Sequence, residues 1–581
     1  MRNNNVEKKK SRVFLKLIIA IFILAILAFG ALFAYKVAPN YINNEITDKT
    51  NLVINFTNVT GRMKQEMIID ENNVVYLSMN DIKNYYDKHI YYDEQYNQIV
   101  TSSETKLAVL KLDEYAITVN GKQEKINGCA KVVDDVYYLP ISEMQKVYDV
   151  RVDMLENRVV IESLDRELKT SELTKKASVK YKATTFSRTI EKLQEGEKVV
   201  IAQVDENTIP EGWVKVRTEN GNLGYIEEKY LTIPEIEREA KIYEKQIDGK
   251  ISLAWEYFSE YATAPDNTGK IYEGVNVVSP SFFYLKLSNT DKENLTKVDV
   301  LEQSNLLENV GDKGIQYINW AKQNGYKIWP KVTNDTLPST IDEFSCIIND
   351  FQLRENMINQ IKEYVKKYDL DGINLDFEYM YKADKEAFSR FVIELAPQLR
   401  DMGVCLSVDV TAPDGADNWS LCYDRNVIGE VADYIVFMGY DQYGTNSIGT
   451  TSGYNWLRIS LNKFMDYDEI PADKIILGLP FYTKIWKTKN DEVVSSQVVF
   501  MSAVDNFIPA NASKEWKEDI QQYYVQYEKD GYIYKMWVED LKSFEKKIEL
   551  VEEYGLAGAG YWRKGFESKD VWSVIRENLG L

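Results

Sequence analysis

The octapeptide Asp371–Glu378, with the sequence DGINLDFE, holds the groups of this chain best suited to chemistry. Read as a β-strand, it places alternate side chains on opposite faces. One face is then apolar, and the other carries Asn374, Asp376 and Glu378. Aspartate and asparagine are depleted in strands. Two carboxyl groups and an amide on one strand face therefore indicate a functional site.

Two carboxyl groups at this spacing suit the cleavage of a glycosidic bond. Such a bond breaks through an oxocarbenium-like transition state, so the enzyme must protonate the leaving oxygen and stabilise a positive centre. Glu378 is the candidate acid, and it has to be protonated near neutral pH. We expect the charge of Asp376, together with desolvation in a confined site, to raise the pKa of Glu378.

Composition excludes several other kinds of site. The net charge of -20 argues against a nucleic-acid partner, because binding to phosphates needs a basic surface. The single histidine, His89, excludes histidine-based triads and histidine-ligated zinc. The four cysteines are scattered without CxxC spacing, so we predict no metal site and no cofactor.

The acidic octapeptide falls within a pattern of short apolar strands alternating with amphipathic helices, which predicts an α/β fold with a parallel sheet. Eight strands, the number in one (β/α)₈ TIM barrel, are predicted at Ile251–Tyr257, Gly274–Ser279, Lys327–Val332, Gly372–Glu378, Val404–Val410, Tyr434–Tyr440, Lys474–Pro480 and Ala557–Trp562. Helices are predicted at Glu355–Lys367, Lys385–Arg400 and Asp540–Tyr554. Active sites of such barrels lie at the C-terminal ends of the strands. The stretch 484–536 is too long for a loop and predicts an inserted α+β lobe.

The chain begins with a basic segment, residues 1–12, followed by an apolar run over residues 13–35. About 20 apolar residues span a bilayer as a helix. The basic flank places the N-terminus in the cytoplasm and the rest of the chain outside the cell. We therefore predict a single-pass protein of the cell membrane. A cleaved signal peptide is the alternative, although its apolar core is usually shorter.

Two modules are predicted between the apolar run and the barrel. Residues 48–165 contain a duplicated α+β unit, in which Val74–Ile82 repeats as Val136–Met144, and they resemble the copper amine oxidase N-terminal domain without implying copper. Residues 172–233 form an all-β unit, and they resemble the small barrel of bacterial Src-homology-3-like domains, which implies either wall-peptide binding or a spacer. Pro234–Lys250 is expected to be a charged linker with helical character.

The barrel region, about residues 250–581, resembles glycoside hydrolase family 18. Asp371–Tyr379 supplies Asp-x-x-Asn-x-Asp-x-Glu on the fourth strand, Met438–Asp441 supplies Met-x-Tyr-Asp on the sixth, and a tryptophan ends the eighth. Leu477–Tyr482 and Tyr554–Trp562 are most similar to the spore cortex-lytic, peptidoglycan-hydrolysing branch.

This resemblance implies a substrate-assisted, retaining mechanism in which the 2-acetamido oxygen of the sugar attacks the anomeric carbon. Glu378 would act as the acid and then as the base. Asp376 would hold the acetamido N–H, and Tyr440 would donate a hydrogen bond to the acetamido oxygen. Asp441 would contact the sugar, and Trp562 would stack beneath it.

One departure from the family is Asn374, which stands where the family has a middle aspartate that shares a proton with the next. We expect Asp376 to stay more ionised as a result. Asn374, Tyr561 and Trp329 are further candidate substrate-binding residues. Asp371 begins its strand and is expected to be structural.

The predicted function is hydrolysis of β-1,4 bonds following N-acetylglucosamine in peptidoglycan. The partners would be wall glycan, the cytoplasmic membrane and wall peptides, with no nucleic acid. A chitinase acting on chitin fragments is the alternative within the same class. A non-catalytic glycan-binding protein of the cell envelope is the alternative from another class.

Overall fold

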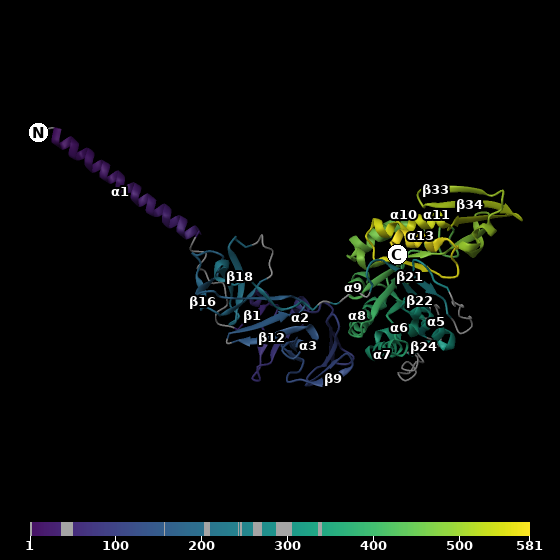
Figure 1. Ribbon diagram of the computed structural model, residues 1–581, viewed down its shortest axis with the longest axis horizontal. Coiled ribbons are helices and arrows are strands. Elements are labelled where there is room, and N and C mark those ends of the chain that lie inside the picture. Colours follow the sequence, from purple (N-terminus) through teal and green to yellow (C-terminus); the bar gives the residue numbers. More distant parts are fainter. Residues whose placement is uncertain are drawn as a thin grey trace. The chain divides into compact units, whose positions relative to one another are not determined.

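The chain forms two compact units, one comprising Met1–Ser103 with Ala108–Glu244 and the other Glu104–Leu107 with Lys245–Leu581 (Figure 1). The computed structural model describes residues 3–36, 50–155, 157–202, 209–241, 243, 247–258, 270–285, 305–334 and 340–581.

The first unit begins with helix α1 (Asn3–Lys36). Its segment Phe14–Tyr35 is long and apolar enough to cross a membrane, and these side chains are exposed. Membrane anchors and secretion signals share this length and composition, so the helix is compatible with either role.

The predicted duplication is present. Strand β4 (Val75–Ser78) leads into helix α2 (Met79–Tyr85), and β11 (Val136–Pro140) leads into the one-turn helix α3 (Gln145–Tyr148). β4 and β11 pair antiparallel, so the two copies share one sheet. A strand pair follows each helix: β5 (Tyr91–Asp93) with β6 (Gln98–Ser102), and β12 (Val150–Leu155) with β13 (Arg158–Ser163).

The next module is a seven-stranded antiparallel sheet in the order β16-β15-β19-β18-β17-β14-β20. Three of its strands are β15 (Ala177–Lys180), β16 (Thr189–Leu193) and β17 (Lys198–Ile201). A hairpin joins β18 (Trp213–Thr218) to β19 (Leu223–Glu227), with Gly221 at a positive φ that suits glycine. The expectation of a helical linker is wrong at its start, because β20 (Glu235–Arg238) pairs with β14 (Leu168–Glu172). That pairing occupies its backbone groups in the sheet.

The second unit contains the predicted ring of eight strand positions, each parallel to its neighbour. The positions are β21 (Ile251–Glu256), β22 (Val277–Pro280), β25 with β26 (Lys327–Ile328 and Lys331–Thr333), β27 (Gly372–Asp376), β28 (Cys405–Val410), β29 (Tyr434–Met438), β30 (Ile475–Pro480) and β36 (Gly558–Trp562). β25 pairs with β22, β26 pairs with β27, and β36 pairs with both β30 and β21. The fold is therefore TIM-barrel-like.

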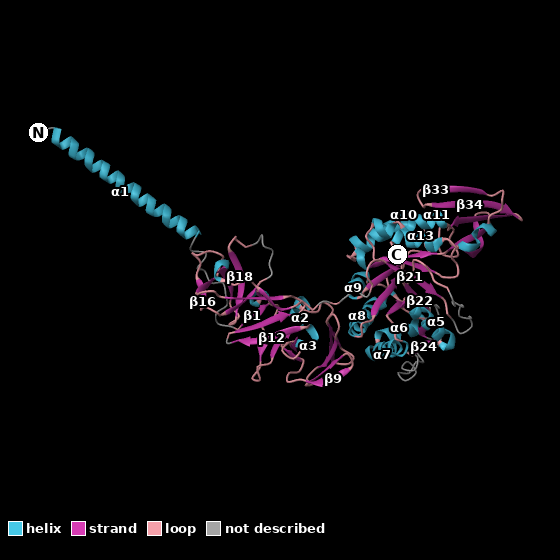
Figure 2. Cartoon of the chain, viewed as in Figure 1, coloured by secondary structure: helices cyan, strands magenta, loops and turns pink. Residues whose placement is uncertain are grey.

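Helices surround these strands (Figure 2). They include α5 (Gly311–Gln323), α6 (Ile341–Asn349), α7 (Phe351–Tyr368), α8 (Lys385–Asp401), α9 (Arg425–Val431), α10 (Tyr454–Asp466), α11 (Leu541–Ile548), α12 (Leu550–Glu553) and α13 (Val571–Leu579). Asp540 caps α11 by accepting from the backbone N–H of Ser543. The predicted helices correspond to α7, α8 and the α11–α12 pair, the last interrupted at Glu549.

Strand alternation divides the barrel into two apolar cores. Ile373, Leu375 and Phe377 pack outward with helix residues in the larger core. A smaller core, which includes Trp255 and Trp329, fills the inside of the ring. The polar face of β27 is therefore directed inward.

The inserted lobe differs from its prediction. It is a five-stranded antiparallel sheet in the order β32-β31-β35-β34-β33 with one 3₁₀ helix, rather than an α+β unit. Its strands are β31 (Tyr482–Lys489), β32 (Glu492–Phe500), β33 (Ser513–Lys517), β34 (Gln522–Lys529) and β35 (Tyr532–Val538). Alternating apolar positions such as Val525 and Met536 bury a core of its own.

Candidate active site

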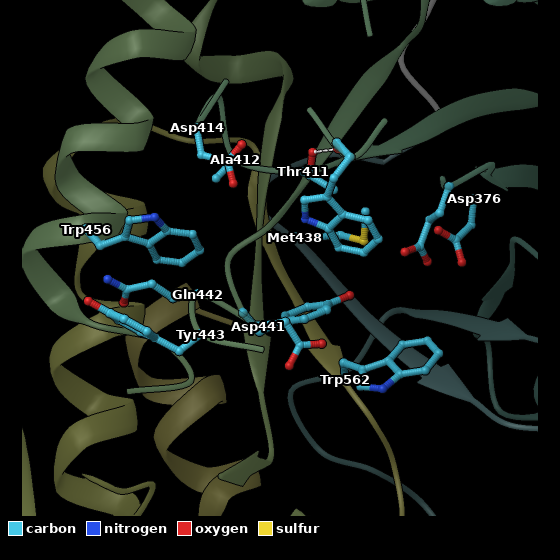
Figure 3. Close-up of a pocket in the computed structure, with 13 residues that line it drawn as sticks. Asp376, Thr411, Ala412, Asp414, Met438, Asp441, Gln442, Tyr443, Trp456 and Trp562 are labelled. Carbon is cyan, nitrogen blue, oxygen red and sulfur yellow. Dashed lines mark hydrogen bonds between the residues drawn. The ribbon is translucent and has the colours of Figure 1, made fainter. Parts of the chain in front are cut away.

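A cavity of about 440 Å³ opens at the C-terminal ends of β27, β28, β29 and β36. Its lining combines four carboxyl groups with five aromatic rings. The lining residues are Asp376, Glu378, Thr411, Ala412, Asp414, Trp419, Met438, Tyr440, Asp441, Gln442, Tyr443, Trp456 and Trp562. Figure 3 shows Asp376 and Trp562 on one side of the cavity, facing Trp456, Gln442 and Tyr443 on the other.

Glu378 lies two residues beyond the end of β27, and its backbone is fixed. Its N–H donates to Asn334 Oδ1 and its carbonyl accepts from Asn334 Nδ2, both at 2.9 Å. The Tyr423 hydroxyl donates to the Phe377 carbonyl at 2.8 Å. Burial, and then the charge of Asp376, raise the pKa of Glu378 well above its ordinary value. The raised pKa favours the protonated form of this carboxyl group, which is the form that an acid catalyst needs.

Asp376 is buried beside Glu378 and forms an ion pair with a lysine that was not predicted from the sequence. Lys331, on β26, donates to Asp376 Oδ2 at 2.6 Å and lies 4.7 Å from the centre of the Trp562 ring. No lysine, arginine, amide or hydroxyl of the described residues donates to Asp376 Oδ1. This oxygen is available to the protonated carboxyl of Glu378 or to a bound N–H group.

Tyr440 and Trp562 contribute two neighbouring aromatic rings to the lining of the cavity. Their rings stack with centroids 6.4 Å apart and planes at 27°. Trp255 supports both rings from inside the barrel, at 6.4 Å from Tyr440 and 5.8 Å from Trp562. Burial, followed by the nearby charge of Asp409, raises the pKa of Tyr440 well above its ordinary value. The hydroxyl group of Tyr440 therefore stays protonated and remains a hydrogen-bond donor.

Asp441 connects the cavity to the inserted lobe. Lys484, on β31, donates to Asp441 Oδ1 at 2.5 Å and to the carbonyl of Tyr443 at 3.0 Å. Asp441 has a φ of 55°, in the left-handed region that aspartate tolerates better than most residues. Its side chain is partly exposed in the cavity, consistent with the predicted contact to a ligand.

Two candidate substrate-binding residues lie below the floor of the cavity. Trp329 is fully buried inside the barrel, stacks on Tyr434 at 5.8 Å, and covers Gly372, where a Cβ atom would lie 2.3 Å from the Trp329 ring. Asn374 is also fully buried, and its Oδ1 accepts from Trp255 Nε1 at 2.7 Å. The prediction of substrate contact is wrong for both, because both side chains pack inside the barrel and neither lines the cavity.

Tyr561 is a third correction. It is fully buried on the outside of the strand ring, where it stacks on Phe481 at 5.4 Å. Strand alternation explains this, because Trp562 points inward and its neighbour must point outward. Asp371 is structural as expected, since it accepts from Lys327 Nζ at 2.8 Å and from the Ile328 N–H at 3.0 Å.

Several lining residues escaped sequence analysis. Asp414 and Trp419 come from the segment after β28, while Trp456 comes from α10. These residues lie outside the predicted strands, so strand alternation gave no signal for them. In the described ranges, no three histidine, cysteine, aspartate or glutamate residues are grouped to hold a metal ion.

This arrangement places a carboxyl group with a raised pKa, a second carboxyl group, a phenol and a flat indole face around one space. Such a set matches what the cleavage of a sugar acetal requires. Residues 254–566 match the family model described as glycosyl hydrolases family 18. The chain belongs to this family. Residues 53–161 of the same chain match the copper amine oxidase N-terminal domain, so both of these resemblances are confirmed.

Relatives of this family 18 member include glycosylases of Bacillus subtilis (strain 168). The uncharacterized glycosylase YvbX is 26% identical over 279 residues, which cover 46% of this chain and 79% of YvbX. The cortical fragment-lytic enzyme is 25% identical over 262 residues, which cover 43% of this chain and only 59% of that protein. The crystal structure of the Bacillus megaterium QM B1551 spore cortex-lytic enzyme SleL aligns at 18% identity with a TM-score of 0.48, over 66% of this chain and 89% of that one.

Proposed function

We propose that this family 18 hydrolase cleaves the β-1,4 bond following N-acetylglucosamine in peptidoglycan by a substrate-assisted, retaining mechanism. One observation carries the proposal. Glu378, whose pKa is raised by burial and by the charge of Asp376, lies beside an Asp376 oxygen that no other described donor occupies, in a cavity lined by Tyr440 and Trp562. The four groups match the needs of a 2-acetamido sugar at the point of cleavage.

In the first step the acetamido carbonyl oxygen bonds to the anomeric carbon while the bond to the leaving oxygen breaks. Glu378 donates its proton to that leaving oxygen. Asp376 accepts a hydrogen bond from the acetamido N–H, and its charge stabilises the oxazolinium ion that forms. The Tyr440 hydroxyl group donates a hydrogen bond to the acetamido oxygen. Trp562 stacks against the apolar face of the sugar.

In the second step the same groups act in reverse. Glu378, now a carboxylate, takes a proton from water as the water attacks the anomeric carbon. The bond between the anomeric carbon and the acetamido oxygen breaks, and the acetamido group is restored. Two displacements at one carbon retain its configuration. Asp441, held by Lys484, would contact the sugar at the cleavage site.

The choice of peptidoglycan rests on the relatives and on the rest of the chain. One curated relative is named a cortical fragment-lytic enzyme. We infer that helix α1 anchors the chain in the cytoplasmic membrane with the hydrolase outside. We also infer that residues 172–233 form an Src-homology-3-like domain that binds wall peptides.

The test compares wild type with Glu378→Gln on purified wall glycan. New reducing ends are reduced with borohydride and identified by mass spectrometry. We expect N-acetylglucosamine ends from the wild type and a loss of at least about 100-fold in Glu378→Gln, since a general acid contributes at least that factor. Glu308→Gln is the matched control, because it removes a carboxylate that pairs with Lys367 instead of lining the cavity.

Each alternative function predicts a different result. Release from chitin oligomers alone would favour a chitinase. Glycan binding by both proteins without new ends from either would favour a non-catalytic binding protein. N-acetylmuramic acid at the new ends would contradict the proposed bond.

A further inference from the structure

Asp409 is a buried acid beneath the cavity to which the mechanism above gives no role. It lies on β28, where the register pairs Leu375 with Val408, so Asp409 is the next neighbour of Asp376 on the inner face of the ring. Asp409 is 2% exposed and does not line the cavity. It lies directly behind the residue proposed to hold the acetamido group.

The hydrogen bonds around Asp409 fix its position. Asn374 Nδ2 donates to Asp409 Oδ1 at 2.6 Å and to Ser407 Oγ at 3.1 Å. The other end of the amide is already used, because Asn374 Oδ1 accepts from Trp255 Nε1 at 2.7 Å. The amide therefore cannot turn without losing these bonds, and it presents N–H groups to Asp409.

The charges around Asp409 do not balance if every carboxyl group is ionised. The titratable groups that face it are Asp376, Glu378, Lys331 and Tyr440. Lys331 is already paired with Asp376, and within the described ranges no lysine or arginine forms an ion pair with Asp409. Three carboxyl groups thus share one cation at a buried site, where unpaired charge is costly. A proton on Glu378 and a second proton on Asp409 would leave this buried group of side chains without net charge, and the pKa of both carboxyl groups is raised.

We propose that Asp409 is a positioning residue for the reaction. It is a third carboxyl group whose ionisation raises the pH up to which Glu378 can act as an acid. This inference rests on the proposed function. While Asp409 keeps its proton, the charge of Asp376 is balanced by Lys331, and Glu378 releases its proton to the leaving oxygen. When Asp409 ionises, a second negative charge appears behind Asp376, and Glu378 holds its proton more firmly.

The direction of the effect follows from electrostatics. Burial, and then the charge of Asp376, raise the pKa of Asp409 well above its ordinary value, and the charge of Asp409 adds to the causes that raise the pKa of Glu378. A neutral side chain at position 409 cannot supply that charge. In a variant with such a side chain, Glu378 should lose its proton at a lower pH than in wild type. The alkaline limb of its activity profile should therefore lie at lower pH than that of wild type.

The experiment measures kcat and KM against pH for the full-length wild type, Asp409→Asn, Ser407→Ala and Glu378→Gln on soluble peptidoglycan fragments. Asp409→Asn keeps an acceptor for Asn374 and removes only the titrating group. We expect its kcat on the acid side to stay within about threefold of wild type. The alkaline limb of its kcat profile should move to lower pH. A shift of one pH unit should lower kcat tenfold on the sloping part of the profile. Ser407→Ala loses a hydrogen bond to Asn374 without any change in charge, so its limb should match wild type.

A rescue variant makes the test sharper. The exchange Asn374→Asp with Asp409→Asn returns one carboxyl group to the same hydrogen-bonded pair, and the alkaline limb should move back up. Asp409→Thr removes the same charge with a smaller side chain and provides the measurement if Asp409→Asn does not fold.

Two results would overturn the inference, and they are distinguishable. If Glu378→Gln is inactive while Asp409→Asn has the alkaline limb of wild type, the proposed function stands and the role of Asp409 is refuted. If Glu378→Gln keeps wild-type activity, the proposed function fails, and the role of Asp409 fails with it.

Discussion

Replacing Lys331 by methionine removes the cation of the active site while leaving most of its volume. Lys331 and Asp376 are 2.6 Å apart, with side chains only 11% and 3% exposed. At an effective dielectric constant of about 20, two unit charges at that distance attract by about 6 kcal/mol. Desolvation offsets part of this, and breaking one side of a buried pair typically costs about 3–5 kcal/mol. We therefore expect Lys331→Met to lower the free energy of unfolding by that amount.

Lys331→Met should also change the pH dependence of activity. The charge of Lys331 lowers the pKa of both Glu378 and Asp409, although burial raises both overall. Without the lysine both values rise further, so the alkaline limb of the kcat/KM profile should move to higher pH. We also expect kcat to fall about 100-fold, because Asp376 loses the group that fixes its orientation. The assay is initial rate against pH on soluble peptidoglycan fragments, at a temperature where the variant is folded.

The matched control is Lys547→Met. Lys547 is fully buried and pairs with Glu539, and neither residue lines the cavity. The Lys547→Met variant should also lose stability, because it breaks one side of a buried ion pair. Its activity should keep the pH profile of wild type. An unchanged alkaline limb in Lys331→Met, or the same shift in Lys547→Met, would refute the reasoning.

Three further predictions concern single side chains. Tyr440→Phe should lower kcat about 100-fold with a smaller change in KM, because the acetamido oxygen loses the hydrogen bond that orients it for attack; steady-state kinetics checks this. Trp562→Ala should raise KM roughly 2- to 13-fold, the equivalent of about 0.5–1.5 kcal/mol of ring contact, in the same kinetic assay. Glu378→Gln should unfold at a higher temperature than wild type at neutral pH. Burial raises the folded-state pKa of Glu378, so wild-type stability falls as pH rises from the unfolded value of about 4.3 through the folded value, and the difference should vanish below about pH 4 in calorimetry.

The barrel was predictable because its strands are buried on both sides and separated by amphipathic helices. The polar face of β27 was predictable for a related reason, since Asp376 and Glu378 stand out in an apolar strand. Lys331 and Asp409 carry the same signal, a charged side chain inside an apolar strand, and applying the alternation rule to β26 and β28 would have found both. The same rule assigns Tyr561 to the outer face of its strand, because the next residue, Trp562, points inward.

Other features depend on tertiary contacts that the sequence does not display. Asn334 fixes the backbone of Glu378 through two hydrogen bonds across 44 positions of sequence. Lys484 reaches Asp441 from the inserted lobe. The strand at Glu235–Arg238 forms because β14 offers it an edge, although its charged sequence suggested a linker.

The central claim is that the acetamido group of the substrate acts as the nucleophile while Glu378 supplies the proton. Two substrates test it most directly, identical except that the sugar at the cleaved bond carries an N-acetyl or an N-trifluoroacetyl group. Fluorine withdraws electrons from the carbonyl oxygen and weakens it as a nucleophile, so the mechanism predicts a large fall in kcat with a similar KM. Equal kcat values for the two substrates would contradict the account.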